Sequence, residues 1–415
     1  SGLNLLNRLQ RYKPMATIGI IREGKIPADN RVALTPSQCK WLIKSFPSIK
    51  IFVQPSSTRC FADKEYERAG AIVSEDLSQA DYLFGIKEVP QQSLLNDKTY
   101  LFFSHTKKLQ PYNQSLFQAM IQARITLIDY ECLEHDDGQR IIGFGFFAGV
   151  VGAHNGVLAF GKRTGLFNLE RVYKHKNFRE LIHNYFELKL PPIKIAVTGS
   201  GRVAHGIMEV LNLMGVREVE PDEYLQRAFS YPVYVQLKGG DLFRSRKSGG
   251  YNREDFHANH QEYECLFRAY LTTTDILLNG IYWEEGMDRL FDEESLRQPD
   301  FKLLTIADIT DDAFGSVPIN LGDQTIEDPV YGVDKFSLQK TAPYLANSVD
   351  VIAVGNLPNE LPRDASRYFG EQLIKFILED LLLKGNSPML DRATLLKHGK
   401  LTAPFEYMRD YAGIA

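Results

Sequence analysis

A glycine-rich turn near the middle of the chain constrains the fold more than any other feature. The segment 193–206 has the sequence IKIAVTGSGRVAHG, in which an apolar run to Val197 is followed by two glycines. A helical pattern then extends from Val203 to Met214. This order predicts a buried parallel strand, a tight turn and a helix. A parallel sheet is covered by helices on both faces, so the sequence predicts an α/β fold.

The same turn has the chemistry of a dinucleotide site. Gly199 permits the tight turn, and Gly201 lets the backbone approach a pyrophosphate because it has no Cβ. The free N–H groups at the start of the helix attract phosphate, and Glu220 follows at the spacing of an acid that holds a ribose diol. A glycine turn alone also occurs in other α/β units, but strand, turn, helix and acid together favour a cofactor. The predicted contacts are Gly199, Ser200, Gly201, Arg202, Val203 and Glu220.

Composition excludes several classes of function. The 415 residues are enough for two domains, with 44% hydrophobic and 24% charged residues, as in an ordinary globular protein. The net charge of -4 provides no cationic excess, so we expect no nucleic-acid partner. No apolar run is long enough to span a membrane, which favours a cytoplasmic protein.

Cysteine and histidine give no sign of a metal site. Cys39, Cys60, Cys132 and Cys265 lie far apart and are expected to be buried thiols rather than disulfides or zinc ligands. The histidines are scattered, so we expect no metal.

The first half alternates strands with helices. Residues 1–16 are poorly patterned and are expected to form a loose leader. Thr35 is the expected N-cap of a helix that begins at Pro36 and continues through Phe46. The predicted strands are Thr17–Ile21, Ile49–Val53, Tyr82–Ile86, Tyr100–Phe103 and Ile125–Asp129.

The second half repeats the alternation after a long apolar helix over Gly145–Phe160. Its predicted strands are Ile193–Val197, Glu218–Glu220, Ile276–Asn279, Leu303–Ala307 and Val351–Val354. Residues 229–263 are expected to form an insertion on the surface. An amphipathic helix at Ser366–Leu383 is expected to pack back on the first domain.

We therefore expect two Rossmann-like domains with parallel, helix-flanked sheets and a cleft between them. Residues 17–145 with 355–415 would form the substrate domain, and 146–354 the dinucleotide-binding domain.

Ionisable side chains follow three strands of the first half. Ligands lie beyond the carboxyl ends of parallel strands, so side chains at these positions are candidates for an active site. Lys87 emerges from an apolar strand, where desolvation would lower its pKa towards neutrality. His105 is suited to proton transfer near neutral pH, and Glu131 would set the charge state of the lysine.

Three basic residues are candidate anchors for substrate carboxylates. Arg31 precedes a helix and offers a bidentate fork, and Lys108 and Arg140 lie in neighbouring loops. Each of these residues also has an ordinary structural explanation, such as a solvated lysine or a hairpin arginine. Their repetition around successive strand ends favours a site.

Beyond these patterns, the chain resembles a known superfamily. Residues 20–36, IIREGKIPADNRVALTP, resemble the opening of the alanine dehydrogenase and transhydrogenase alpha-subunit superfamily. Within it, the chain most resembles lysine-forming saccharopine dehydrogenases and lysine-ketoglutarate reductase domains. The segments behind this resemblance are 99–106 TYLFFSHT, 127–131 LIDYE, 144–149 FGFFAG, 278–284 LNGIYWE, 306–310 IADIT and 356–362 NLPNELP.

The resemblance implies an enzyme that condenses lysine with 2-oxoglutarate and reduces the imine with NAD(P)H to saccharopine, or the reverse. It implies Lys87 and His105 as acid–base groups with Glu131 close to them. Arg31, Lys108 and Arg140 would bind carboxylates. It also implies cofactor contacts from Gly280, Ile281, Tyr282 and Asp308.

The choice between NAD and NADP stays open at this point. Glu220 would repel a 2′-phosphate and favours NAD. The reductase domains of animals, which this chain resembles in the segment 219–221 VEP, prefer NADP. Arg244, Arg246 and Lys247 in the insertion offer a phosphate clamp, or simply a solvated charged face. Glu88 after Lys87 is similar to the fungal saccharopine dehydrogenases, whereas the reductase domains of animals tend to a basic residue there.

Two other functions compete with this hypothesis. An alanine dehydrogenase-like enzyme would use Lys87, His105 and Arg31 on a smaller keto acid, and a regulatory protein would bind the nucleotide without turnover.

Overall fold

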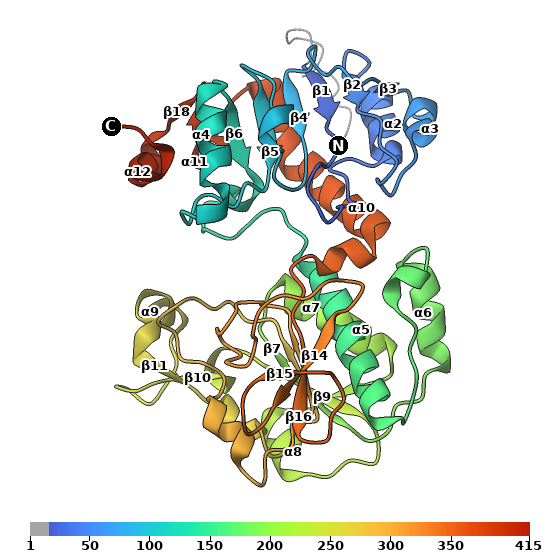
Figure 1. The fold of residues 1–415 in the computed structure, drawn as a ribbon, viewed down its shortest axis with the longest axis vertical. Coiled ribbons are helices and arrows are strands. Elements are labelled where there is room, and N and C mark those ends of the chain that lie inside the picture. Colours follow the sequence, from blue (N-terminus) through green and yellow to red (C-terminus); the bar gives the residue numbers. More distant parts are fainter. Residues whose placement is uncertain (1–15) are drawn as a thin grey trace. The chain divides into compact units, whose positions relative to one another are not determined.

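The computed structural model describes residues 16–415, and the expected leader falls mostly outside them. The chain divides into two compact units, each built on an eight-stranded sheet (Figure 1). Unit 1 comprises the described residues up to Phe144 together with Pro362–Ala415, and unit 2 is Gly145–Leu361. Unit 2 ends at Leu361 and not at residue 354, the boundary expected from the sequence. The reason is that the short helix η9 (Leu357–Glu360) packs against helix α5 (Gly145–Thr164) of unit 2.

Unit 1 contains a mostly parallel sheet in the order β18-β17-β6-β5-β4-β1-β2-β3. The parallel strands are β1 (Thr17–Ile20), β2 (Lys50–Val53), β3 (Ile72–Val73), β4 (Tyr82–Phe84), β5 (Thr99–Phe102) and β6 (Thr126–Asp129). All five strands predicted for the first half are therefore present. Each is a short apolar run with a buried face, as the pattern required.

The helices of unit 1 begin where the sequence places capping residues. The side chain of Thr35 accepts a hydrogen bond from the Gln38 amide, and Pro36 occupies the first turn of α2 (Pro36–Ser45). This start was predicted correctly because the signal is local. The other helices are α3 (Asp63–Arg68), α4 (Gln114–Gln122), α10 (Pro362–Gln372), α11 (Pro388–Ala393) and α12 (Arg409–Ala412).

The C-terminal tail completes unit 1. Helix α10 continues into the π-helical turns η10 (Leu373–Leu378) and η11 (Asp380–Lys384), and it buries Phe369, Leu373 and Ile377 in the core of the unit. The predicted packing of the tail on the first domain is confirmed. Two strands that were not predicted, β17 (Thr394–Lys397) and β18 (Lys400–Leu401), extend the sheet antiparallel from β6.

Unit 2 has a sheet in the order β15-β14-β16-β13-β12-β7-β9-β8. Its strands are β7 (Lys194–Thr198), β8 (Arg217–Glu218), β9 (Val233–Leu237), β12 (Ile276–Asn279), β13 (Thr305–Asp308), β14 (Val330–Asp334), β15 (Lys340–Thr341) and β16 (Ser348–Ile352). Only β14 and β15 run antiparallel to their neighbours. The predicted fold class of two α/β units with parallel sheets is confirmed.

The helices of unit 2 are α5 (Gly145–Thr164), α6 (Phe178–Glu187), α7 (Arg202–Leu213), α8 (Pro221–Gln226) and α9 (Arg253–Ala258). Helix α5 is the long apolar helix that the sequence predicts, and it packs against α7, β12 and β13. Gly149 and Gly206 allow α5 and α7 to approach closely, because a Cβ on either would collide with a backbone carbonyl of the other helix. The turn at Gly199 is therefore supported by a tightly packed helix pair.

The expected surface insertion is wrong in its first part. Residues Val233–Leu237 form β9, an interior strand that pairs with β7 and has Val233, Val235 and Leu237 fully buried. The run VYVQL has the β-branched and aromatic character of a strand, and its position inside a long connection concealed it. The rest forms a hairpin of β10 (Phe243–Ser245) and β11 (Tyr263–Cys265), with α9 between the two strands.

All four cysteines are free thiols; Cys39, Cys132 and Cys265 are buried as expected, and Cys60 is half-buried. In residues 16–415 no group of three or more His, Cys, Asp or Glu side chains is placed to hold a metal ion. No helix in that range combines the length and apolar character needed to cross a membrane.

Candidate functional site

Lys87 and His105 lie at the same edge of the sheet of unit 1. Lys87 follows β4 and His105 follows β5, and these strands pair in parallel from Tyr82 and Thr99 onward. Their carboxyl ends therefore meet at one edge. His105 has a φ of +49°, a left-handed backbone conformation that a residue other than glycine adopts only when its surroundings enforce it.

A carboxylate orients the imidazole of His105. Nδ1 of His105 lies 2.9 Å from Oε1 of Glu88, and the other oxygen of Glu88 accepts from Lys25 at 2.9 Å. Burial raises the pKa of Glu88, but the hydrogen bonds from His105 and Lys25 outweigh it and hold that pKa well below its usual range. An ionised carboxylate only accepts, so Nδ1 carries the proton and Nε2 is left to exchange one.

Asn113 holds this pair in place. Its Nδ2 donates to Oε1 of Glu88 at 3.0 Å and to the carbonyl of Ser104 at 2.9 Å. The amide thus ties the loop after β5 to the loop after β4. The resulting arrangement of acid, imidazole and free Nε2 is the usual device for general acid–base chemistry.

The amine of Lys87 is set up to change its protonation near neutral pH. Burial lowers the pKa of Lys87 to about 8, and the positive charge of Arg31 adds to the lowering while Asp29 opposes it. Lys87 Nζ forms no hydrogen bond within residues 16–415. An amine with this pKa and no partner is available to a ligand.

Glu23, which sequence reasoning missed, supports the turn that carries Lys87. Its carboxyl group accepts from the amide of Lys87 at 2.6 Å and from that of Ile86 at 3.1 Å. Burial raises the pKa of Glu23 to about 8, although these two hydrogen bonds oppose the rise. The missed signal was its place just after β1, which pairs with β4.

Arg31 is not the free fork that the sequence led us to expect. It is 3% exposed, and its Nε and Nη2 bind the carboxylate of Asp29 at 3.0 and 2.6 Å. The guanidinium also lies 4.4 Å from the ring centre of Phe144. A buried arginine needs a counter-charge before any substrate arrives, and Asp29 provides it. Only Nη1 is left without a hydrogen bond to a described residue.

Glu131 does not set the charge of Lys87 as expected. Its Oε1 lies 3.4 Å from Nη2 of Arg140 and 3.8 Å from Nζ of Lys107, and the main charges acting on Lys87 come from other residues. Oε2 of Glu131 is buried and has no hydrogen-bond partner in the described chain. A buried carboxylate oxygen without a donor is suited to accept a hydrogen bond from a cationic ligand.

The two lysines of the loop after His105 have different surroundings. Lys108 is exposed, and its side chain pairs with nothing within residues 16–415, whereas the neighbouring Lys107 reaches Glu131. Arg140, which is also exposed, does join Glu131. Sequence alone could not show which of these two adjacent lysines contacts Glu131.

The glycine turn of unit 2 has the shape that a pyrophosphate requires. Gly199 has a φ of +110°, and a Cβ there would collide with the carbonyl of Gly280. A Cβ on Gly201 would meet nothing within 4 Å, so the backbone at the start of α7 is open. Ser200 is exposed, and Arg202 and Val203 are half-buried at that start, so the residues present fit a dinucleotide phosphate group.

Asp308 supports the site from beneath rather than lining it. It is 1% exposed, and its two oxygens accept from Asn279 at 2.9 Å and Asn320 at 2.8 Å. Burial raises the pKa of Asp308 to about 6. The expectation of a direct cofactor contact is therefore corrected, because both oxygens already have protein donors.

The other candidates after β12 differ in exposure. The Gly280 amide bonds to the carbonyl of Thr198 at 3.0 Å, which joins this turn to β7. Ile281 is buried at 7% exposure, while Tyr282 is 69% exposed and donates to Glu284 at 2.9 Å.

Glu220, the N-cap of α8, is not placed for the predicted ribose contact. It follows β8, and β9 separates β8 from β7 in the sheet. The prediction assumed that the strand after α7 is the neighbour of β7, as in the usual dinucleotide fold. The side chain that follows the actual neighbour is Lys238, which the sequence analysis did not consider.

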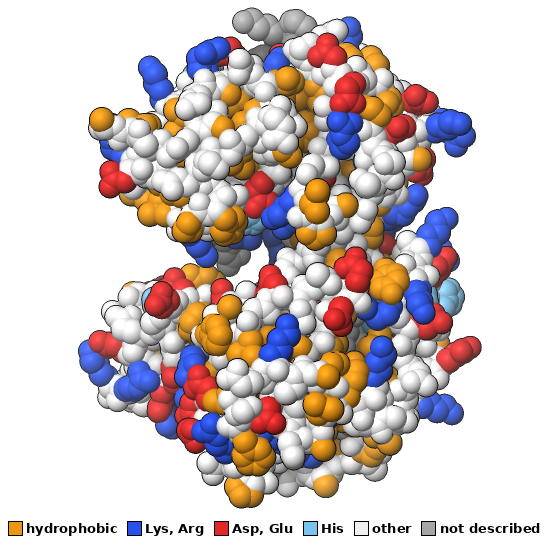
Figure 2. Space-filling view, in the orientation of Figure 1, with side chains coloured by type: hydrophobic (Ala, Val, Ile, Leu, Met, Phe, Trp, Pro, Cys, Tyr) orange, Lys and Arg blue, Asp and Glu red, His pale blue; other side chains and the backbone are white. Residues whose placement is uncertain are grey.

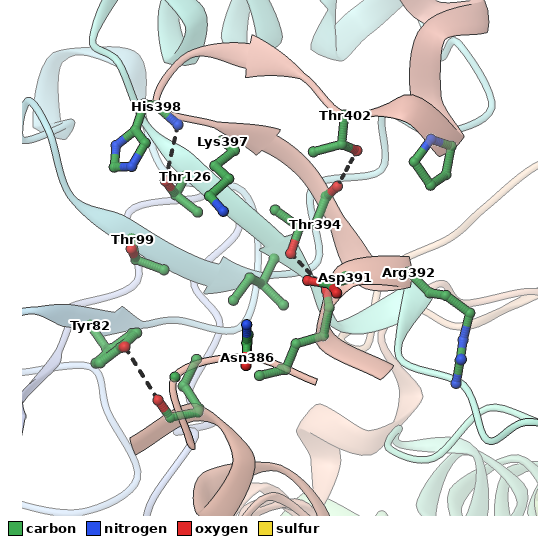
Figure 3. Close-up of a pocket in the computed structure, with 15 residues that line it drawn as sticks. Tyr82, Thr99, Thr126, Asn386, Asp391, Arg392, Thr394, Lys397, His398 and Thr402 are labelled. Carbon is green, nitrogen blue, oxygen red and sulfur yellow. Dashed lines mark hydrogen bonds between the residues drawn. The ribbon is translucent and has the colours of Figure 1, made fainter. Parts of the chain in front are cut away.

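The cavity shown in Figure 3 lies in unit 1, at the edge of the sheet opposite to Lys87 and His105. It has a volume of about 440 Å³ and is lined by Tyr82, Thr99 and Thr126, which begin β4, β5 and β6. Residues of the tail, such as Asn386 and Lys397, form the rest of its lining. Lys87 and His105 follow the opposite ends of these strands, so this cavity is not the candidate active site.

Comparisons with known proteins show which proteins this chain is similar to. Residues 19–151 match the model of the alanine dehydrogenase/PNT N-terminal domain. The chain is 30% identical to alpha-aminoadipic semialdehyde synthase of Rattus norvegicus, over 97% of this chain and 48% of that protein. The chain is homologous to the saccharopine dehydrogenases and the aminoadipic semialdehyde synthases. The predicted resemblance is thereby confirmed.

Two further comparisons bear on length and fold. Saccharopine dehydrogenase [NAD(+), L-lysine-forming] of Candida glabrata is 28% identical over 89% of this chain and 93% of its own. The chain spans about half the length of the semialdehyde synthases. A solved L-alanine dehydrogenase superposes with a TM-score of 0.62 at 15% identity, covering 95% of this chain and 98% of its own, which shows a shared fold alone.

Proposed function

We propose that this protein is an oxidoreductase that interconverts lysine, 2-oxoglutarate and NAD(P)H with saccharopine and NAD(P). The homology to saccharopine dehydrogenases over most of their length supports this assignment. Unit 1 would bind the amino and keto acids, and unit 2 the dinucleotide.

The observation that carries the proposal is the pair of proton-exchanging groups at one sheet edge. In the synthetic direction the ε-amine of lysine adds to the keto carbon, and a proton must reach the former carbonyl oxygen before water leaves. Lys87 Nζ and His105 Nε2 are the two groups free to move these protons. The cofactor, when bound, supplies the hydride that reduces the imine carbon.

Basic groups around this edge would hold the carboxylates of the substrates. Nη1 of Arg31, the exposed guanidinium of Arg140 and the exposed amine of Lys108 remain candidates. The unpaired Oε2 of Glu131 would accept the α-ammonium group of an amino acid.

Alanine dehydrogenase-like activity is a second candidate, because the matched domain model at residues 19–151 includes that class. The same Lys87 and His105 would serve ammonia and pyruvate. The homology to saccharopine dehydrogenases beyond residue 151 favours the larger substrates.

Steady-state oxidation of NADH and NADPH distinguishes the candidates. We expect turnover with lysine plus 2-oxoglutarate and little with ammonia plus pyruvate. The reverse preference would establish the alanine dehydrogenase-like enzyme. Tight cofactor binding without turnover on a panel of amino and keto acids would establish a regulatory nucleotide-binding protein.

A further inference from the structure

A cavity at the far edge of the sheet of unit 1 is large enough for a small metabolite. It is the cavity of about 440 Å³ in Figure 3, bounded by the first residues of β4, β5 and β6 and by the C-terminal tail. Small-molecule sites usually have volumes of about 300–1,000 Å³. The acid–base candidates Lys87 and His105 follow the other ends of these strands, so the proposed function leaves this cavity unused.

One wall of the cavity is aliphatic. Ile128 of β6, Leu381 of η11 and Leu390 of α11 form this wall, and each is at most 4% exposed. The tail is tied to the sheet here, because the hydroxyl of Tyr82 donates to the carbonyl of Leu381 at 3.2 Å. The wall belongs to the core of unit 1, so it is formed before any ligand arrives. It would shield an aliphatic group of a ligand from water.

Two opposite charges line the same cavity and are not paired with each other. Within residues 16–415, the amine of Lys397 and the carboxylate of Asp391 form no hydrogen bond or ion pair. The side-chain amide of Asn386 and the hydroxyl of Thr99 are also without a partner in that range. Figure 3 shows the amine of Lys397 pointing towards the loop that carries Asn386. A cation, an anion, an amide and a hydroxyl are thus available to one ligand.

Other polar groups of the lining are already engaged. Arg392 donates to the carboxylate of Asp136 at 3.2 Å, which lies outside the lining. The hydroxyl oxygen of Thr126 accepts from the amide of His398 at 3.1 Å. The imidazole of His398 points away from Lys397 in Figure 3. The charges left to a ligand are therefore those of the unpaired lysine and aspartate.

We propose that this cavity binds a free α-amino acid with an aliphatic side chain. Its α-carboxylate would bind the amine of Lys397, and its α-ammonium group the carboxylate of Asp391. Its side chain would lie on the aliphatic wall. A ligand that carries only one of the two charges would leave one lining group unpaired, so the site favours a zwitterion. The site is separate from the candidate active site and does not depend on the proposed function.

Isothermal titration calorimetry of the full chain with L-leucine tests the proposal, because leucine is not a substrate of the proposed reaction. We expect saturable binding of L-leucine. Two analogues of leucine each lack one charge: 4-methylpentanoate has no ammonium group, and 3-methylbutylamine has no carboxylate. Each should bind about tenfold more weakly than leucine or worse, the effect of one lost charge-assisted hydrogen bond.

Four variants locate the bound leucine. Lys397→Met and Asp391→Asn should each weaken it about tenfold. Lys400→Met, at an exposed lysine of β18 outside the lining, is the matched control and should bind leucine as the wild type does. Lys87→Met, in the candidate active site, should also keep the wild-type affinity for leucine.

Three results would overturn the inference: no binding of L-leucine by a folded wild type, unchanged affinity in Lys397→Met or Asp391→Asn, or equal affinity for leucine and either analogue. Loss of binding in Lys87→Met would place leucine in the candidate active site and would overturn it too. Each of these results leaves the proposed function standing, because turnover of lysine and 2-oxoglutarate tests that function separately.

Discussion

At the scale of single residues, the site is defined by which charges are paired and which are left free. Glu88 and Asp29 each accept hydrogen bonds from a neighbouring side chain before any ligand binds, so His105 and Arg31 are held in fixed orientations. Lys87 Nζ has no such partner, and burial keeps its pKa near 8. This contrast is what qualifies the lysine for proton transfer.

Glu23 makes a prediction about stability against pH. Its pKa is raised from 4.5 to about 8 in the folded chain, so the folded state binds more protons than the unfolded state between these values. This contribution to stability is complete below pH 4.5 and is lost as the pH rises through 8. Glu23→Gln keeps one acceptor oxygen, which can serve the Lys87 amide, and cannot ionise. It should therefore remove the pH-dependent loss while giving up the hydrogen bond from the Ile86 amide.

Urea unfolding at several pH values between the two pKa values measures this effect. The midpoint of the wild type should fall more steeply with pH than that of Glu23→Gln. Glu75→Gln, at an exposed carboxylate whose pKa is lowered by Arg22, is the control and should follow the wild type. Parallel curves for wild type and Glu23→Gln would show that the carboxyl group is ionised throughout.

At the scale of elements, local signals predicted structure well and long-range pairing did not follow from them. The start of α2 was predicted from Thr35 and Pro36, and the turn at Gly199 from its own residues. Strand β9 was missed because it lies in the long connection that was expected to be a surface insertion, and no local signal shows that it is the neighbour of β7. The error over Glu220 follows directly from that omission.

The site shows the same division between local and distant information. Lys87 and His105 were found because each follows an apolar strand. The pairing of Arg31 with Asp29 was missed even though the two are close in sequence, because burial rather than spacing creates the need for a counter-charge. Asn113 is linked to Glu88 across a long stretch of chain, and no local pattern marks such a contact.

The close packing of α5 on α7 makes a prediction at this scale. A Cβ at Gly206 would collide with backbone atoms of Phe146 and Val150, so the helices must separate in Gly206→Ala. Overpacking of this kind costs about 1–3 kcal/mol in the free energy of unfolding. Because α7 carries the glycine turn, affinity for the dinucleotide should fall as well.

Urea unfolding and cofactor titration of Gly206→Ala measure both effects. Gly250→Ala is the control, because a Cβ there meets only the hydroxyl of Ser248 at 3.9 Å. A stable Gly206→Ala protein with normal cofactor affinity would mean that the helix contact does not support the turn.

At the scale of the whole molecule, each unit has its own buried core. Positive and negative side chains are interspersed over the face of unit 2 visible in Figure 2, and they form no patch of one sign there. The net charge of -4 likewise provides no cationic excess.

The two tryptophans of the chain allow the units to be followed separately. Trp41 lies in α2 of unit 1, and Trp283 lies in unit 2, where it donates to the carbonyl of Asp288 at 3.2 Å. A dinucleotide at 100 times its dissociation constant adds about 2.7 kcal/mol to the unfolding free energy of the unit that binds it. We expect NADPH to raise the thermal midpoint reported by Trp283 in Trp41→Phe more than the midpoint reported by Trp41 in Trp283→Phe. Equal shifts would show that the units unfold as one.

The most direct test of the central claim is the formation of saccharopine from lysine and 2-oxoglutarate, followed together with cofactor oxidation. Wild type should form it, and Lys87→Met should reduce turnover by about 10²–10⁴-fold, the range for a lost acid–base group, with cofactor affinity unchanged. Lys64→Met, at an exposed lysine of α3, should behave like wild type. Wild-type turnover by Lys87→Met, or no saccharopine from a wild type that binds NADPH, would contradict the account.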